Sequence, residues 1–204
     1  MGTWERHEIW DEWGSTTRFL KSARRAMSEE AKRWRNAPVK DADSILLEYS
    51  EGGSTYTIAA KDHAATLESP RLLCGMTLLY SYALLEEHAR TLCRALGVDE
   101  SLRGGIESWA SDLLAEVSRD WSGVKEGKAG AVEASIVRNA FAHGIAAYDT
   151  SMVNRYTNVQ LPAPWQVGDP VVIDFDRLEE LRARLRSLAR VLGDGMTNLK
   201  VPGP

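Results

Sequence analysis

Residues 70–97 read PRLLCGMTLLYSYALLEEHARTLCRALG and contain the strongest helical pattern of the chain. Pro70 opens a helical pattern, and Gly97 is suited to its C-terminal cap. Between them the apolar side chains leave little polar face before the Glu86-Glu87-His88 cluster. A helix that is apolar nearly all round is central to its domain or lies at an oligomer interface. We therefore predict one long central helix here.

The two cysteines of the chain, Cys74 and Cys93, both fall in this predicted helix. Nineteen residues at a rise of about 1.5 Å per residue separate them by roughly 28 Å. A disulfide requires Cα atoms within about 7 Å of each other, so the two cannot pair if the helix is unbroken. Two unpaired cysteines in apolar settings favour a reducing compartment, and we expect the cytoplasm.

Weaker patterns indicate the remaining elements. Apolar periodicity or helix propensity predicts four more helices, at residues 10–34, 106–124, 131–147 and 176–192. β-Prone runs at 44–50 and 54–58 flank a Gly-Gly turn and suggest a short β-hairpin. Residues 154–170, with three prolines, are predicted to form a loop.

These elements predict a mainly all-α protein, an up-and-down helical bundle with an N-terminal elaboration. Residues 1–69 hold the predicted N-terminal helix and possible hairpin. Residues 70–193 hold the bundle, in which leucines at 178, 181, 185, 188 and 192 form a packing seam. Residues 194–204 are expected to be a flexible tail.

The composition excludes several classes. The formal net charge is −4, with 44% hydrophobic and 26% charged residues, which is ordinary for a globular protein. No run approaches 18 apolar residues, so we expect no membrane span, and the acidic N-terminal residues do not resemble a signal peptide. Nucleic acid could be bound only by a local patch. We interpret the arginines of the last predicted helix as solvated surface, with steering of RNA as the alternative.

Motifs for cofactors and metals are missing from the sequence. It has no GxGxxG, GxxxxGK[ST], HExxH or CxxC, and its four histidines lack the spacing of metal ligands. We therefore expect neither a cofactor nor a metal. Glu86 and Glu87 are adjacent and point about 100° apart on a helix, so they do not form one acid/base dyad. A solvated face is the simpler interpretation of that cluster.

One constellation carries recognisable chemistry. Residues 138–144 read RNAFAHG. Asn139 and His143 are four residues apart and share a helix face, and the long Arg138 side chain can reach round to them. Histidine transfers protons near neutral pH, and arginine holds phosphate in two places without losing its charge. These are the parts that metal-free cleavage of RNA needs.

The motif resembles that of the HEPN superfamily, whose ribonuclease members carry Arg, commonly followed by Asn, and then His after four to six residues. The stretch from Tyr80 through Glu86-Glu87 resembles the tyrosine-plus-acid stretch of many HEPN helices. The resemblance covers residues 70–193. It implies a helical bundle that acts as a two-fold homodimer, in which the motif helices meet and form one cleft for an RNA substrate.

The resemblance also implies roles. His143 would be the general acid/base, Arg138 would stabilise the phosphate, and Asn139 would orient His143 or bind phosphate. Glu86 or Glu87 would position Arg138. A role in defence against phage or as a toxin, with an antitoxin or defence-system partner, follows from resemblance alone.

One position departs from the family. Ile145 stands where HEPN toxins silenced by a nucleotidyltransferase carry a tyrosine, and the nearest tyrosine, Tyr148, is a candidate supporting residue together with Glu86 and Glu87. This argues against that toxin–antitoxin subtype, or at least against its modification chemistry.

Two other interpretations stay open. The chain could be a catalytically silent HEPN module that dimerises and binds a nucleotide, RNA or a protein partner, with His143 as a structural residue. It could also be a helical adaptor whose N-terminal tryptophans dock a partner, although packing is the simpler role for those at 4, 10, 13 and 34.

Overall fold

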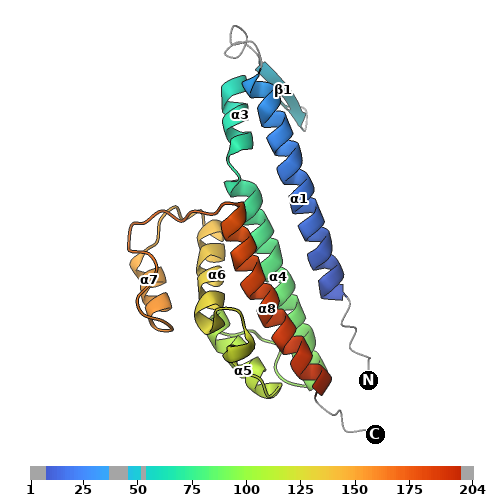
Figure 1. The fold of residues 1–204 in the computed structure, drawn as a ribbon, viewed down its shortest axis with the longest axis vertical. Helices are drawn as coiled ribbons and strands as arrows, with labels where there is room; N and C mark the ends of the chain where they lie inside the picture. The colour runs from blue at the N-terminus through green and yellow to red at the C-terminus, as the bar shows by residue number, and fades with distance from the viewer. Residues whose placement is uncertain (1–7, 37–45, 52–53, 199–204) are drawn as a thin grey trace. The chain divides into compact units, whose positions relative to one another are not determined.

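The computed structural model describes residues 8–36, 46–51 and 54–198, and it is mainly α-helical (Figure 1). Its helices are α1 (Glu8–Arg35), α3 (Ala60–Glu68), α4 (Arg71–Leu96), α5 (Ile106–Glu116), α6 (Gly127–Ala142), α7 (Thr150–Thr157) and α8 (Phe175–Asn198), with a short 3₁₀ turn, η1 (Trp121–Gly123). None of the described helices is long and apolar enough to cross a bilayer.

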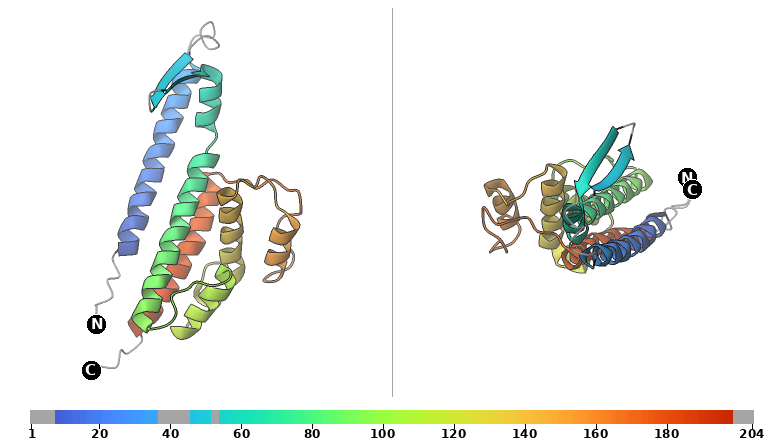
Figure 2. Two further views of the ribbon diagram at one scale, coloured as in Figure 1. Left: turned by 180° about the vertical axis from the view of Figure 1, so that it is seen from behind. Right: turned by 90° about the horizontal axis from the view of Figure 1, so that it is seen from above.

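The elements divide into two compact units. One is Thr17–Leu73, and the other comprises the described parts of Met1–Thr16 and Cys74–Pro204. The second unit is the helical bundle, in which α6 and α8 pack together with α5 and α7 beside α6 (Figures 1 and 2). Trp13 is buried in the bundle, Trp10 and Trp34 are half-buried, and Trp4 lies outside the described residues.

The bundle core is built on α6 and on the leucine seam of α8. All five predicted seam leucines are fully buried, which confirms the seam. Every residue from 131 to 137 on α6 is also buried. The long helix predicted at 70–97 is confirmed as α4, and both of its cysteines are buried and unpaired. Its apolar surface is not buried on every side, because Met76 and Tyr80 are 60% and 46% exposed.

Two glycines allow close packing within the bundle. A Cβ on Gly75 of α4 would lie 2.3 Å from Cδ1 of Phe141 on α6, so only glycine fits without displacing that ring. A Cβ on Gly195 would lie 2.7 Å from Cβ of Val117. The α8 helix continues past Gly193 to Asn198, into the segment for which the sequence predicted a tail.

Predicted boundaries at 106–124 and 154–170 are also wrong. The helix predicted at 106–124 is α5, which ends at Glu116 because Ser118 takes a φ of +54°. Asp120 then caps η1, its side chain accepting from the Ser122 amide. In the second stretch, α7 covers residues 150–157, with the Asp149 side chain accepting from the Met152 amide at 2.8 Å. An Asp before a helix is a common N-cap. The three prolines later in this stretch led to the prediction of a loop instead of this helix.

The interpretation of the α8 arginines as solvated surface is wrong for two of them. Arg182 and Arg184 are each about 5% exposed. Arg182 donates to Ser81 Oγ at 2.9 Å and lies over the Trp13 ring. Arg184 donates to Glu133 at 2.6 Å, and the carboxylate of Glu133, also buried, accepts from Arg177 as well. The opposite charge of Glu133 makes the buried guanidinium group of Arg184 tolerable, whereas that of Arg182 is held by the Ser81 hydroxyl and the Trp13 ring.

The unit of residues 17–73 contains the C-terminal part of α1, the α3 helix and two strands. The strands β1 (Leu46–Glu51) and β2 (Ser54–Ala59) run antiparallel, with Leu46 opposite Ala59. The Gly-Gly turn predicted between them lies outside the described residues. Trp34 of α1 meets His63 of α3 edge to face at a centroid distance of 5.7 Å, and Arg35 pairs with Glu68 at 2.8 Å.

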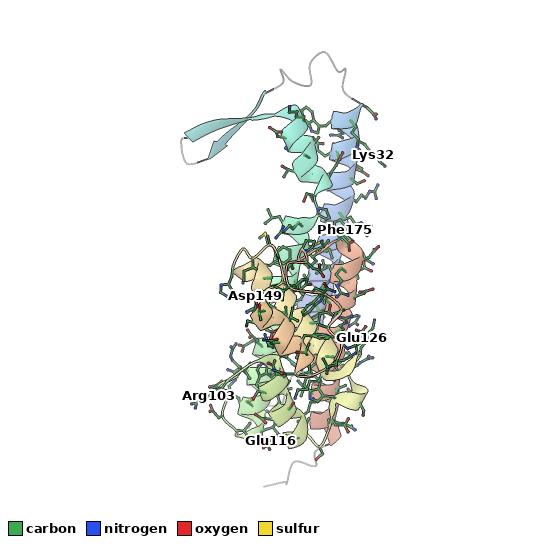
Figure 3. All side chains as sticks on the ribbon, turned by 90° about the vertical axis from the view of Figure 1, so that its left-hand side faces the viewer. Lys32, Arg103, Glu116, Glu126, Asp149 and Phe175 are labelled. Atoms are coloured by element: carbon green, nitrogen blue, oxygen red, sulfur yellow. The ribbon has the colours of Figure 1, made fainter. Side chains whose placement is uncertain are left out.

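Glu133→Gln is expected to lower the free energy of unfolding by roughly 3 kcal/mol, since it leaves two guanidinium groups without their buried counter-charge. Urea unfolding at neutral pH measures this. The matched control is Glu116→Gln, an exposed carboxylate of the same bundle (Figure 3), for which a change within about 0.5 kcal/mol is expected. Equal loss in both variants would contradict the role of Glu133.

Candidate functional site

The RNAFAHG motif lies at the C-terminal end of α6. The helix ends at Ala142 rather than at the predicted residue 147, because Gly144 adopts a left-handed φ of +66°. The amide of Ile145 then donates to the carbonyl of Ala140 at 2.8 Å, which closes the helix end. Gly144 is therefore required for the cap. His143 is the C-cap residue, and its amide donates to the Asn139 carbonyl at 3.0 Å.

Arg138 is the best-anchored side chain of the motif. One guanidinium nitrogen donates to Asn139 Oδ1 at 2.8 Å, and another lies 4.0 Å from Oε2 of Glu86 on α4. The guanidinium carbon is 4.7 Å from the centre of the Tyr82 ring, a cation–π geometry. The Arg138 side chain is 29% exposed. These contacts hold the guanidinium in place while leaving part of it accessible.

A polar hollow of about 310 Å³ opens beside Arg138. Residues of α4, of the chain before α5, and of α5, α6 and α7 line it: Tyr82, Glu86, Leu102, Gly104, Gly105, Ile106, Glu107, Trp109, Ser135, Arg138, Asn139 and Arg155. It therefore contains two arginines and two carboxylates. An anion would meet both guanidinium groups there.

Arg155 is a site residue that the sequence analysis missed. Its Nε and NH2 atoms donate to the two oxygens of Glu107 at 2.8 and 2.6 Å, and NH2 also lies 3.2 Å from Ser135 Oγ. Burial raises the pKa of Glu107, but the hydrogen bonds and charge of Arg155 outweigh it and lower that pKa overall. The sequence signal that could have revealed α7 was Asp149, a suitable N-cap residue. A helix beginning there would have placed Arg155 on a helix face.

His143 does not line the hollow. Its side chain is exposed, one helical turn beyond Asn139, which does line it. Within one chain, therefore, the structure brings Arg138, Asn139 and Glu86 together and leaves His143 outside the group. A phosphate bound at Arg138 and a proton transfer at His143 would need a surface that reaches both.

The other two predicted supporting residues lie elsewhere. Glu87 is exposed and accepts from Arg94 at 2.8 Å. Tyr148 is buried and stacks on Trp165 with ring centroids 4.1 Å apart, and burial raises its pKa to about 12. Neither residue lines the hollow of Arg138.

His88, from the same sequence cluster, is a core residue. It is 7% exposed, and its Nε2 lies 3.2 Å from the carbonyl oxygen of Ala189, as expected for an N–H donating to that oxygen. Burial lowers its pKa from 6.5 to about 4, which the bond to Ala189 only partly offsets. The neutral imidazole thus joins α4 to α8 and takes no part in the hollow.

Metal ligands do not gather in the part of the chain that the structure describes: no three His, Cys, Asp or Glu side chains there are grouped as a metal site requires. Comparison of the chain with protein-family models, with curated protein sequences and with solved structures finds no match.

His88 is expected to make stability depend on pH. Between pH 6.5 and about 4 the unfolded chain binds a proton that folded His88 does not. Stability is therefore lost as the pH falls through this window, by up to about 3 kcal/mol from this group. Urea unfolding of wild type and His88→Gln across the window measures the difference. The same pH dependence in both proteins would contradict this assignment.

Proposed function

We propose that the protein is a metal-independent endoribonuclease of HEPN type that acts as a homodimer. The observation that carries the proposal is the end of α6. There Arg138 is anchored at an accessible polar hollow with a second arginine, and the exposed His143 stands one turn further on. The proposal also rests on the resemblance of residues 138–144 to the HEPN ribonuclease motif. A cytoplasmic role in defence or toxicity rests on the same resemblance.

The proposed reaction is an internal displacement at phosphorus. A neutral imidazole of His143 takes the proton from a ribose 2′-OH. The 2′-oxygen attacks the neighbouring phosphorus, and the bond to the 5′-oxygen breaks. The protonated imidazole of a second His143 gives its proton to that leaving oxygen. The products are a 2′,3′-cyclic phosphate and a 5′-hydroxyl, and the two histidines exchange protons with water afterwards.

The arginines supply the charge that this reaction needs. Negative charge grows on the non-bridging phosphoryl oxygens, and preorganised cations stabilise it most when their position is already fixed. Arg138 is fixed by Asn139 and Glu86, and Arg155 by Glu107 and Ser135. In this arrangement Asn139 positions Arg138, whereas its predicted contact was with His143 or phosphate.

Dimerisation accounts for the place of His143. A single chain offers one such histidine outside the hollow, whereas the reaction uses a base and an acid. A two-fold axis beside the end of α6 would bring two His143 side chains and two Arg138 side chains into one cleft. The exposed Met76 and Tyr80 of α4 are the kind of large side chains that an interface between copies covers.

A second function is favoured by one observation. The accessible guanidinium of Arg138 already has Asn139, Glu86 and Tyr82 as neighbours, and His143 is not among them. A catalytically silent HEPN module would show the same feature, with the hollow binding a nucleotide or RNA. The two functions differ in whether His143 matters.

His143→Ala is expected to reduce RNA cleavage in EDTA by about 10²–10⁴-fold, the usual contribution of a general acid/base. Cleavage of a mixed RNA, with analysis for 2′,3′-cyclic phosphate ends, measures this. His63→Ala is the matched control, because it removes a histidine from the other unit and should cleave like wild type.

Circular dichroism and size measurement establish that all three proteins fold and dimerise alike. Equal cleavage by wild type and His143→Ala would refute the catalytic role of His143. RNA binding at the hollow without cleavage by the wild-type dimer would favour the silent module. In that case Arg155→Ala should weaken RNA binding and His143→Ala should not.

A further inference from the structure

The second half of α1 concentrates positive charge in an acidic protein. Residues 18–35 contain seven Lys or Arg residues and two Glu residues. The rest of the chain contains 18 Lys or Arg residues against 27 Asp or Glu residues. The described α1 residues before position 17 include Asp11 and Glu12 and no Lys or Arg. One segment of a single helix is thus strongly cationic.

Six of the seven cations share one face of the helix. At about 100° per residue they fall within an arc roughly 120° wide. This basic face of α1 consists of Arg18, Lys21, Arg24, Arg25, Lys32 and Arg35, all of which are exposed. A shallow groove of about 320 Å³ runs along part of it (Lys32 is labelled in Figure 3). Leu20 and Ala31, outside this arc, are buried.

Stabilisation by the helix dipole explains only part of this face. Cations near a helix C-terminus are stabilised by the helix dipole, but that effect is confined to the last turn, here Lys32, Arg33 and Arg35. Arg25 pairs with Glu29 at 2.9 Å and Arg35 with Glu68 at 2.8 Å. Residues 18–35 contain only two glutamates beside their seven cations, so the segment has a formal charge of +5.

We propose that the basic face of α1 binds the phosphate backbone of single-stranded RNA without regard to sequence. From Arg18 to Arg35 it extends about 26 Å at 1.5 Å per residue, enough to follow several successive phosphates. The arc carries Ser28 and no large apolar side chain. A helix that inserts into a lipid surface needs exposed apolar residues beside its cations, so a phosphate chain fits this face better than a membrane.

This binding is distinct from the proposed cleavage, since it lies in the unit of residues 17–73 and requires neither Arg138 nor His143. The physical reason for such a face is the acidity of the remaining chain. A protein with net charge −4 repels a polyanion at long range, and a local cationic stripe restores attraction.

The experiment measures binding of a 2′-O-methyl RNA oligonucleotide to the full chain between about 50 and 200 mM NaCl. The probe lacks a free 2′-OH, so cleavage by the proposed mechanism does not interfere. The test variant is K21Q/R24Q/K32Q. The matched control is R119Q/K125Q/R190Q, which removes the same charge from exposed positions of the bundle.

For K21Q/R24Q/K32Q we expect at least tenfold weaker binding at low salt. The slope of log affinity against log salt should be shallower by about 2, near 0.7 for each lost phosphate contact on a single strand. The control should stay within twofold of wild type. Circular dichroism and thermal unfolding show whether each variant is folded, and a second test variant, K21Q/K32Q, should give an intermediate slope.

Equal weakening in test and control variants would overturn the proposal, because net charge alone would then explain binding. Unchanged binding in the test variant would overturn it too. Displacement of the RNA by polyglutamate at equal charge concentration would instead assign the face to an acidic protein. A wild-type chain that binds this probe and leaves unmodified RNA intact would support the basic face and count against the proposed cleavage.

Discussion

The buried carboxylate of Glu133 is the interaction on which the bundle depends. It is about 4% exposed, accepts from Arg177 and Arg184 of α8, and lies 3.4 Å from the indole nitrogen of Trp165. A carboxylate in that position is tolerable only with its cations in place, so the rotation of α6 and the register of α8 are set together. With α6 so oriented, Arg138, about 140° further round the helix, reaches the opposite side.

The hollow follows from this orientation of α6. Tyr82 and Glu86 come from α4, Glu107 from α5, Ser135 and Arg138 from α6 and Arg155 from α7. The ion pair of Glu107 with Arg155 ties α5 to α7 across the hollow. Polar side chains from four helices are thus collected at one place on the bundle, each held by a neighbour. Such preorganisation is what electrostatic stabilisation of a phosphate requires.

Local signals in the sequence predicted part of this. The α8 seam was recognisable because its leucines step by three and four residues, and α4 because Pro70 and Gly97 bracket an apolar run. Arg138 and Asn139 were identified together as candidate site residues because they are adjacent in the RNAFAHG motif. Predictions were wrong where a backbone conformation ended a helix, as at Ser118 and Gly144, since a positive φ outside a recognised turn leaves little trace in periodicity.

Residue spacing was enough to predict the helical class, the α8 seam and the impossibility of a Cys74–Cys93 disulfide, and to reveal the Arg-Asn-His motif. These depend on spacing along one helix, where 1.5 Å per residue converts sequence into distance. The packing of the helices was needed to show that Arg184 pairs with Glu133, that Arg155 pairs with Glu107 and that His143 lies outside the hollow. Those ion pairs join residues 51 and 48 positions apart, and no periodicity relates the faces of separate helices until packing brings them together.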